Sequence, residues 1–232
     1  MRKKKFYSEI AYILGILLMA LGTALIVTAD FGVSMIVAPA YLLHLKLVPI
    51  LPFFTFGMAE YTFQALLLLL MILILRKFRI SFLFSFVTAV LYGFALDGFS
   101  LLTALLPCGI FCLRVLYFIL GLTICTAGVA FFFNTYISPE VYELFVMEVS
   151  SKFDIETHKF KMFYDFASLL LSVIMSFLFF GLWHFEGIKY GTLVCAALNG
   201  WLIGRFSSLF KKKFEFTDAL NLRPFFEGKE KV

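Results

Sequence analysis

Charged residues are scarce in this sequence. They make up 15% of its 232 residues, whereas hydrophobic residues make up 62%. A soluble domain carries about 25% charged residues, so the composition excludes a soluble protein and predicts a polytopic membrane protein. Each membrane span needs about 20 apolar residues, which leaves room for about six spans and for no separate soluble domain.

The sequence also lacks the motifs of common enzymatic and cofactor sites. It has no phosphate-binding loop, nucleophile elbow or zinc motif, its three histidines have no metal-binding spacing, and its four cysteines include no Cys-x-x-Cys pair. We therefore expect no enzyme, no cofactor, no metal site and no direct use of ATP. The net charge of +5 could suggest nucleic acid as a partner, but the positions of the charges point to a lipid bilayer instead.

Long apolar runs predict an all-α transmembrane helical bundle that occupies the whole chain as one domain. Two further segments, 34–50 and 138–152, look helical but are interrupted by prolines or charges, so we expect neither to cross the membrane fully. The six predicted spans are 10–29, 58–75, 82–105, 110–133, 163–183 and 190–209.

The distribution of Lys and Arg predicts the orientation. With six spans and the N-terminus in the cytoplasm, 17 of the 20 Lys and Arg residues fall on the cytoplasmic side; the exceptions are Lys46, Arg114 and Lys189. Eight spans would instead place two basic clusters outside. We therefore expect a multi-pass protein of a cytoplasmic membrane with both termini inside, including a solvated tail at 211–232.

The two halves of the chain are similar to each other. Residues 85–102 align with 192–209, and seven of these 18 pairs are identical, where roughly two would be expected by chance from so apolar a composition. Two copies of three spans must lie in opposite orientations in the membrane. We therefore predict two inverted repeats, at about 8–105 and 110–210, an arrangement that many secondary transporters share.

Two polar helix starts occupy matching places in the repeats. Ser138 precedes Pro139 and Glu140, which predicts an N-cap followed by a favourable first turn, and Ser34 matches Ser138. In one interpretation these helix starts flank a binding cavity and direct free N–H groups toward it. In the other, both segments lie flat at opposite membrane surfaces as connectors.

Further polar residues are candidates for a substrate site because they fall at matched positions. Asp30 pairs with Asn134 and Glu60 with Asp165. Asp97 has no acidic counterpart and lies at a depth similar to that of Arg114 on the next span, so we predict an ion pair between them, either structural or functional. The predicted substrate-binding set is Asp30, Ser34, Glu60, Asn134, Ser138 and Asp165.

Four apolar stretches carry a family resemblance: Leu21–Ser34, Thr55–Glu60, Leu91–Asp97 and Tyr190–Gly200. They resemble the YczE/YyaS/YitT group of bacterial integral membrane proteins. The resemblance implies a bacterial cytoplasmic-membrane protein and implies no substrate, because that group is largely uncharacterised.

Three functions fit these patterns. The leading hypothesis is a secondary transporter or permease for a small molecule or ion, with its site between the halves and with Asp97 and Arg114 as a gate or proton-linked pair. The second is a substrate-binding subunit that works with a partner membrane protein and an energising complex. The third is a membrane scaffold or regulator, which predicts a dry interior.

Overall fold

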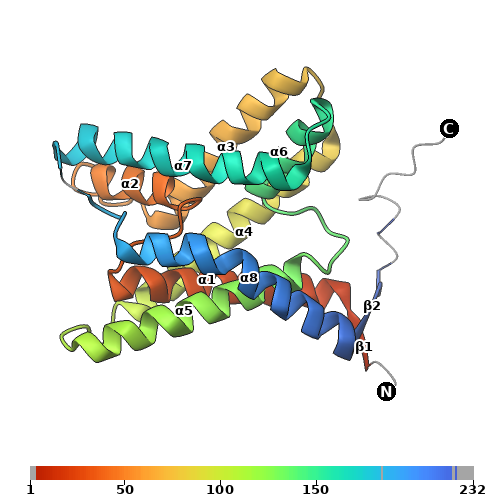
Figure 1. Ribbon diagram of the computed structural model, residues 1–232, viewed down its shortest axis with the longest axis horizontal. Helices are drawn as coiled ribbons and strands as arrows, with labels where there is room; N and C mark the ends of the chain where they lie inside the picture. Colours follow the sequence, from red (N-terminus) through yellow and green to blue (C-terminus); the bar gives the residue numbers. More distant parts are fainter. Residues whose placement is uncertain (1–3, 184, 221–222, 224–232) are drawn as a thin grey trace.

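The computed structural model describes residues 4–183, 185–220 and 223, and it folds these residues into eight helices and two short strands (Figure 1). Six helices are long and apolar enough to cross a membrane, so the predicted all-α bundle with six spans is confirmed. The elements are β1 (Lys4–Tyr7), α1 (Ser8–Ala29), α2 (Ala38–Leu47), α3 (Phe56–Leu75), α4 (Ile80–Thr103), α5 (Phe111–Phe132), α6 (Val141–Lys152), α7 (Thr157–Phe180), α8 (Tyr190–Lys213) and β2 (Phe214–Thr217).

Local chemistry fixes where the long helices begin and end. The hydroxyl of Thr55 accepts a hydrogen bond from the backbone N–H of Met58 at 3.2 Å and so caps the start of α3. Asp30 and Arg76 end α1 and α3 in the left-handed conformation, with φ of 55° and 53°. This conformation turns the chain out of the helix and satisfies one of its last carbonyl groups.

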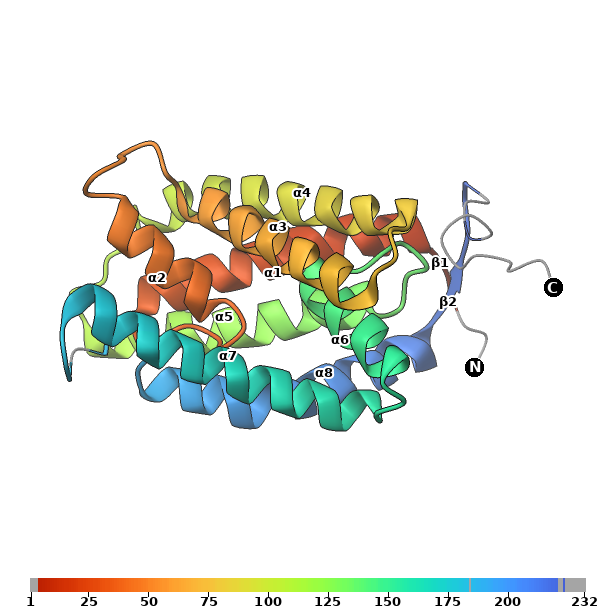
Figure 2. The same ribbon diagram turned by 90° about the horizontal axis from the view of Figure 1, so that it is seen from above.

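The helices form two layers (Figures 1 and 2). In one layer, α1 and α5 pack together at the centre, with α4 on the outer side of α1 and α8 on the outer side of α5. In the other, α2 and α6 lie between α3 and α7, each in contact with both. The two layers are joined where α4 packs against α3 and α6.

The central contact between α1 and α5 depends on glycines that allow the two backbones to approach closely. A Cβ atom added at Gly22 would lie 2.4 Å from the backbone nitrogen of Cys125, and one added at Gly128 would lie 2.7 Å from that of Met19. Gly22 faces Gly121, and Gly15 faces Gly128. Close backbone contact at small residues is a common way to join membrane helices, because lipid supplies no hydrophobic driving force.

The two short helices begin inside the molecule and run to opposite ends. In the turn just before α2, the Met35 carbonyl accepts a hydrogen bond from the Ser168 hydroxyl, in the middle of α7, at 2.8 Å. Farther along, the Lys46 ammonium bonds the Phe179 carbonyl at 3.1 Å, near the end of α7. Helix α2 is about 15 Å long, roughly half of the hydrocarbon core, so it covers half of α7.

Helix α6 has the same relation to α3. The N–H of Val141, its first residue, donates to the side chain of Gln64 in the middle of α3 at 3.1 Å. The Lys152 ammonium, at the other end of α6, bonds the Ile74 carbonyl near the end of α3. Helices α2 and α6 therefore point in opposite directions from the interior.

Both strands lie at one end of the molecule, which we call the terminal end (Figure 1). They pair in parallel, with Lys4 opposite Phe214 and Tyr7 opposite Thr217. Part of the predicted tail at 211–232 is thus ordered, because it completes α8 and forms β2; residues 221–222 and 224–232 lie outside the described part. The opposite end carries Asp30, and we call it the Asp30 end.

The helix pairs α3–α4 and α7–α8 pack differently. At Gly57 of α3, an added Cβ would lie 2.0 Å from the Gly93 carbonyl oxygen of α4, so these backbones touch. Helix α8, by contrast, packs on α5 and makes no comparable contact with α7 among the described residues. An added Cβ at Gly200 of α8 would meet no atom within 4 Å. The bundle is therefore closed along α3–α4 and open along α7–α8.

The glycine contact between α1 and α5 makes a testable prediction. Replacing Gly22 with Ala should destabilise the protein by about 1–3 kcal/mol, because the new methyl group overlaps the α5 backbone. Gly98→Ala is the matched control, since nothing lies within 4 Å of its added Cβ, and Ala favours a helix over Gly. Thermal unfolding in detergent should give a lower midpoint for Gly22→Ala only; equal midpoints for the two variants would contradict the close contact.

Candidate functional site

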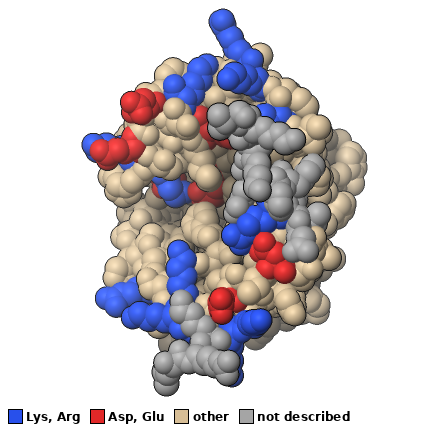
Figure 3. Space-filling view, turned by 90° about the vertical axis from the view of Figure 1, so that its right-hand side faces the viewer, with Lys and Arg blue, Asp and Glu red and all other residues tan. Residues whose placement is uncertain are grey.

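A cavity of about 340 Å³ lies between the two layers, on the open α7–α8 side. This volume lies in the range of small-molecule sites. The terminal end is visibly hollowed, with charged side chains around and inside the hollow (Figure 3), and the cavity reaches His158 in the first turn of α7. Its walls include Met19, Thr23 and Ile26 of α1, Ser34–Val37, Tyr92 of α4, Cys125, Val129 and Phe132 of α5, Glu140, Tyr142 and Glu143, Lys161, Met162 and Asp165 of α7, and Cys195, Asn199, Gly200 and Ile203 of α8.

The starts of both short helices border this one cavity. Ser34 lies in the turn that leads into α2, and its carbonyl accepts hydrogen bonds from the N–H groups of Val37 and Ala38 at 3.0 and 2.9 Å. Glu140 immediately precedes α6 and lines the cavity from the other half. Of the two interpretations left open by the sequence, the structure supports helix starts that flank a cavity rather than connectors at the surface.

One corner of the cavity is acidic. Glu140 is only 5% exposed; its Oε2 atom accepts a hydrogen bond from Gln64 at 3.3 Å, and its Oε1 atom has no hydrogen-bond partner among the described residues. The buried Oδ1 atom of Asp165 also lacks a partner there. Glu143 is paired, because the Lys161 ammonium donates to both of its oxygens at 3.0 and 3.2 Å.

A second buried carboxylate lies behind this corner. Glu60 of α3 is fully buried and does not line the cavity. Its Oε2 atom accepts a hydrogen bond from the Tyr142 hydroxyl at 2.9 Å, and Oε1 has no partner among the described residues. Tyr142 lines the cavity, so it connects Glu60 to the cavity wall. Buried ionisable groups in membrane proteins are costly and commonly serve transport or proton transfer.

Burial changes the acidity of the cavity carboxyl. Removal from water raises the pKa of Glu140 from 4.5 to about 8; the hydrogen bond from Gln64 opposes this rise, and the charge of Glu143 adds to it. Near neutral pH the Glu140 carboxyl therefore holds a proton that a modest change in its surroundings can release.

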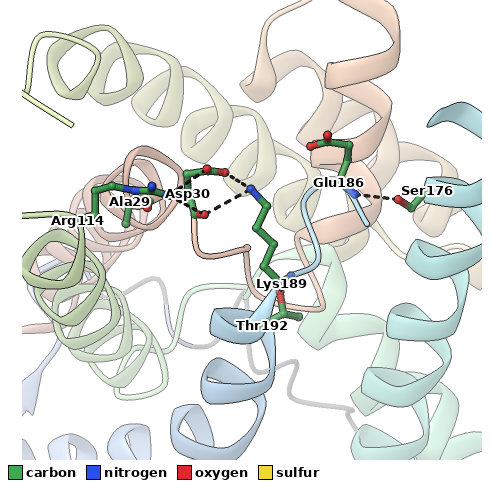
Figure 4. A network of polar contacts seen from close by, with 7 residues as sticks. All are labelled: Ala29, Asp30, Arg114, Ser176, Glu186, Lys189 and Thr192. Atoms are coloured by element: carbon green, nitrogen blue, oxygen red, sulfur yellow. Dashed lines mark hydrogen bonds and ion pairs between the residues drawn. The ribbon is translucent and has the colours of Figure 1, made fainter. Parts of the chain in front are cut away.

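Salt bridges close the cavity at the Asp30 end (Figure 4). The Asp30 carboxylate binds the Arg114 guanidinium at 3.0 Å and the Lys189 ammonium at 2.5 Å. The adjoining backbones are also joined: Val33 N–H donates to the Gly187 carbonyl at 3.0 Å, and Gly191 N–H donates to the Phe31 carbonyl at 2.7 Å. These bonds tie the α1–α2 loop to the start of α8.

The structure corrects the predicted Asp97–Arg114 ion pair. Arg114 binds Asp30, and its Nε atom also donates to the Ala29 carbonyl at 2.9 Å. Asp97 instead accepts hydrogen bonds from the Thr55 hydroxyl at 2.6 Å and the Gly57 N–H at 2.7 Å. Free N–H groups at the start of α3 are thus the partners of Asp97, because a helix N-terminus attracts a carboxylate as a cation does.

The remaining predicted site residues divide into two groups. Ser34 and Asp165 line the cavity. The other four do not line it: Asp30, Glu60, Asn134 and Ser138. Asp30 closes one end of the cavity, and Glu60 lies behind its wall. The Asn134 side chain donates hydrogen bonds to the Ala130 carbonyl at 2.6 Å and to the Ser207 hydroxyl at 3.2 Å. The predicted cap at Ser138 is also wrong. Helix α6 begins later, at Val141, because Gln64 of α3 caps it from outside.

Sequence reasoning missed the residues that make the corner chemically distinct. Glu140 was interpreted only as part of a helix start, and the partnerships of Gln64 with Glu140 and of Lys161 with Glu143 were not predicted. Each partnership joins different helices across the bundle, so no local spacing reveals it. The one available clue was the charge of Glu140 next to apolar spans.

Fold and site together define a multi-pass membrane protein of helices with a partly polar internal cavity. The family of unknown function DUF6198 matches residues 6–208, so the chain belongs to this family. Comparison with curated proteins and with solved structures gives no match.

The buried Glu140 carboxyl predicts a pH-dependent stability. Its pKa is higher in the folded protein than its ordinary 4.5, so folding binds a proton, and the stability from this group falls as the pH rises from 4.5 through about 8. Thermal midpoints should decrease over this range, and Glu140→Gln should reduce the slope. Glu148 pairs with Arg79 outside the cavity, so Glu148→Gln should leave the slope of the thermal midpoint against pH unchanged. Equal slopes in the two variants would contradict the assignment of this pH dependence to Glu140.

Proposed function

We propose that this protein is a secondary transporter or permease for a small solute, and not an enzyme, and that the cavity is its substrate site. The observation that carries the proposal is that the starts of α2 and α6, which come from opposite halves of the chain, border one cavity with an acidic corner. Discontinuous helices that begin at the midplane are a recurrent feature of transporter substrate sites.

Equivalent contacts in the two halves support inverted repeats at about 8–105 and 110–210. Lys46 bonds the carbonyl of Phe179, and Lys152 bonds that of Ile74; each pair joins a short helix of one half to a long helix of the other. Ser168 and Gln64 likewise bond the chain at the starts of α2 and α6. An approximate two-fold axis in the membrane plane would exchange the Lys46 contact with the Lys152 contact, and the Ser168 contact with the Gln64 contact.

The positive charges favour a cytoplasmic location for the terminal end, and we assign the protein to the bacterial cytoplasmic membrane, in line with its resemblance to the YczE/YyaS/YitT group. The loops and helix ends there carry Lys and Arg in clusters. In this orientation the described conformation opens toward the cytoplasm through the gap beside α7 and α8. The salt bridges of Asp30 close the opposite side.

Helix α8 supplies the movement that alternating access requires. If the two halves are inverted repeats, Met162 corresponds to Gly57 and Gly200 corresponds to Gly93. Gly57 and Gly93 touch, whereas Met162 and Gly200 both line the open cavity. Packing α8 against α7 there would close the cytoplasmic side. Asp97 locks α4 to the start of α3, whereas α8 has Gly204 in the corresponding place, so α8 is the free edge.

The acidic cavity also bears on the alternatives. A scaffold needs no such interior, and burying unpaired carboxylates would cost stability without a benefit. A substrate-binding subunit of a larger importer would use the same cavity, and it would co-purify with an ATPase and a partner membrane protein.

Proteoliposomes with the purified protein test the transport function. A panel of radiolabelled cationic, neutral and anionic small solutes should include at least one that the protein takes up, and Glu140→Gln should lower its initial rate by at least tenfold, because the variant has no carboxylate to exchange a proton or bind charge. Glu148→Gln serves as the matched control with an unchanged rate. Absence of flux for the whole panel, with folded protein in the membrane, would contradict the proposal.

A further inference from the structure

We infer that the cavity takes an organic cation, with a protonated amine bound at Glu140 and Asp165 and an apolar body placed against α1 and α5. The inference rests on the proposed function for its role, but it stands on the chemistry of the cavity wall. Three features carry it: buried acidic oxygens without a hydrogen-bond partner, an excess of acidic over basic groups in the corner, and an apolar surface on the rest of the wall.

The unpaired oxygens identify what the ligand must supply. The Oε1 atom of Glu140 and the Oδ1 atom of Asp165 are buried and have no hydrogen-bond partner among the described residues. A carboxylate only accepts hydrogen bonds, and a buried acceptor left without a donor costs roughly 1–3 kcal/mol. A ligand with several N–H donors, such as an ammonium group, supplies the kind of partner that these oxygens lack.

The charge balance of the corner favours a cation over an anion. Three carboxylates, those of Glu140, Glu143 and Asp165, line the cavity beside Lys161. The Lys161 ammonium binds both oxygens of Glu143, and its charge also acts on Asp165, so a single ammonium group faces three acidic groups. A ligand carboxylate would add a like charge in a site that is shielded from water, which is strongly unfavourable.

The rest of the wall favours an organic rather than an inorganic cation. Ile26 of α1 and Val129 and Phe132 of α5 give the cavity an extended apolar surface, and a bare metal ion would leave this surface unused. Among the described residues, no group of three His, Cys, Asp or Glu side chains could hold a metal ion. Tyr92 and Phe132 add aromatic rings that can attract an ammonium group.

Binding of the cation exchanges it for a proton. Near neutral pH Glu140 holds a proton, and the arriving ammonium group displaces it into water through the cytoplasmic opening. Titratable groups from seven neighbouring elements act on Glu140 or line its cavity: Tyr12 of α1, Glu60 of α3, Tyr92 of α4, Cys125 of α5, Tyr142 and Glu143 of α6, His158, Lys161 and Asp165 of α7, and Cys195 of α8. Lys161 apart, none brings a fixed positive charge, so the ligand must supply one.

Calorimetry on the full-length protein in nanodiscs tests the ligand class with three probes of one shape: phenethylamine, phenethyl alcohol and 3-phenylpropionate. The amine should bind at least tenfold more tightly than the other two, and at pH 7 it should release a proton, seen as a dependence of the measured heat on the ionisation enthalpy of the buffer. Glu140→Gln should weaken amine binding at least tenfold and abolish the proton release. Glu148→Gln should change neither.

Several outcomes would overturn the inference. Equal or tighter binding of the alcohol or the carboxylate would do so, as would unchanged amine binding in Glu140→Gln or failure of the folded protein to bind any probe. If Glu140→Gln does not fold, Asp165→Asn takes its place, with the same expected weakening. Amine binding without flux in proteoliposomes would keep the ligand class and contradict transport, whereas uptake of an anion alone would keep transport and contradict the ligand class.

Discussion

The close crossing of α1 and α5 is the constraint on which the other parts of the molecule depend. Glycines at 15, 22, 121 and 128 let the two backbones touch, and each of these helices then supports one outer helix, α4 or α8. Because α1 and α5 belong to different halves of the chain, their contact holds the halves together. It also forms the floor of the cavity, since Thr23 of α1 and Val129 of α5 both line it. Because this contact holds α1 and α5 together, the helices on the two sides of the cavity can pack in different ways.

The walls differ in how polar groups are satisfied. On the closed side, Asp97 binds the first N–H groups of α3, so α3 and α4 are held by charge as well as by contact. On the open side, α8 is tied at its start, where Lys189 binds Asp30, and it leaves Gly200 without a neighbour. Glu140 lines the resulting space. The internal space therefore adjoins both the buried Glu140 residue and the edge of the bundle that α8 leaves open.

Much of this fold could be predicted from the sequence, because bilayer physics acts on local composition. Apolar runs gave all six spans, and the prolines and charges of 34–50 and 138–152 marked them as too broken to cross. The site could be predicted only in part: Ser34 and Asp165 line the cavity as expected, but Asp97 and Arg114 have different partners from those predicted. Depth along a helix can be read from sequence, whereas the direction of a side chain around the helix depends on packing. Loop 30–33, which brings Asp30 to Arg114, has no local pattern that reveals its path.

Cross-linking of α7 to α8 tests most directly the central claim, that α8 can pack against α7 and close the cavity, as α4 packs against α3. In a protein with its own four cysteines replaced, Met162→Cys with Gly200→Cys should form a disulfide in lipid bilayers under mild oxidation, because closure brings these positions within the roughly 7 Å that a disulfide can span. The control pair, Met162→Cys with Trp201→Cys, should not, since Trp201 is exposed and does not line the cavity. A Met162–Gly200 pair that stays reduced while both thiols react freely with maleimide would contradict the account.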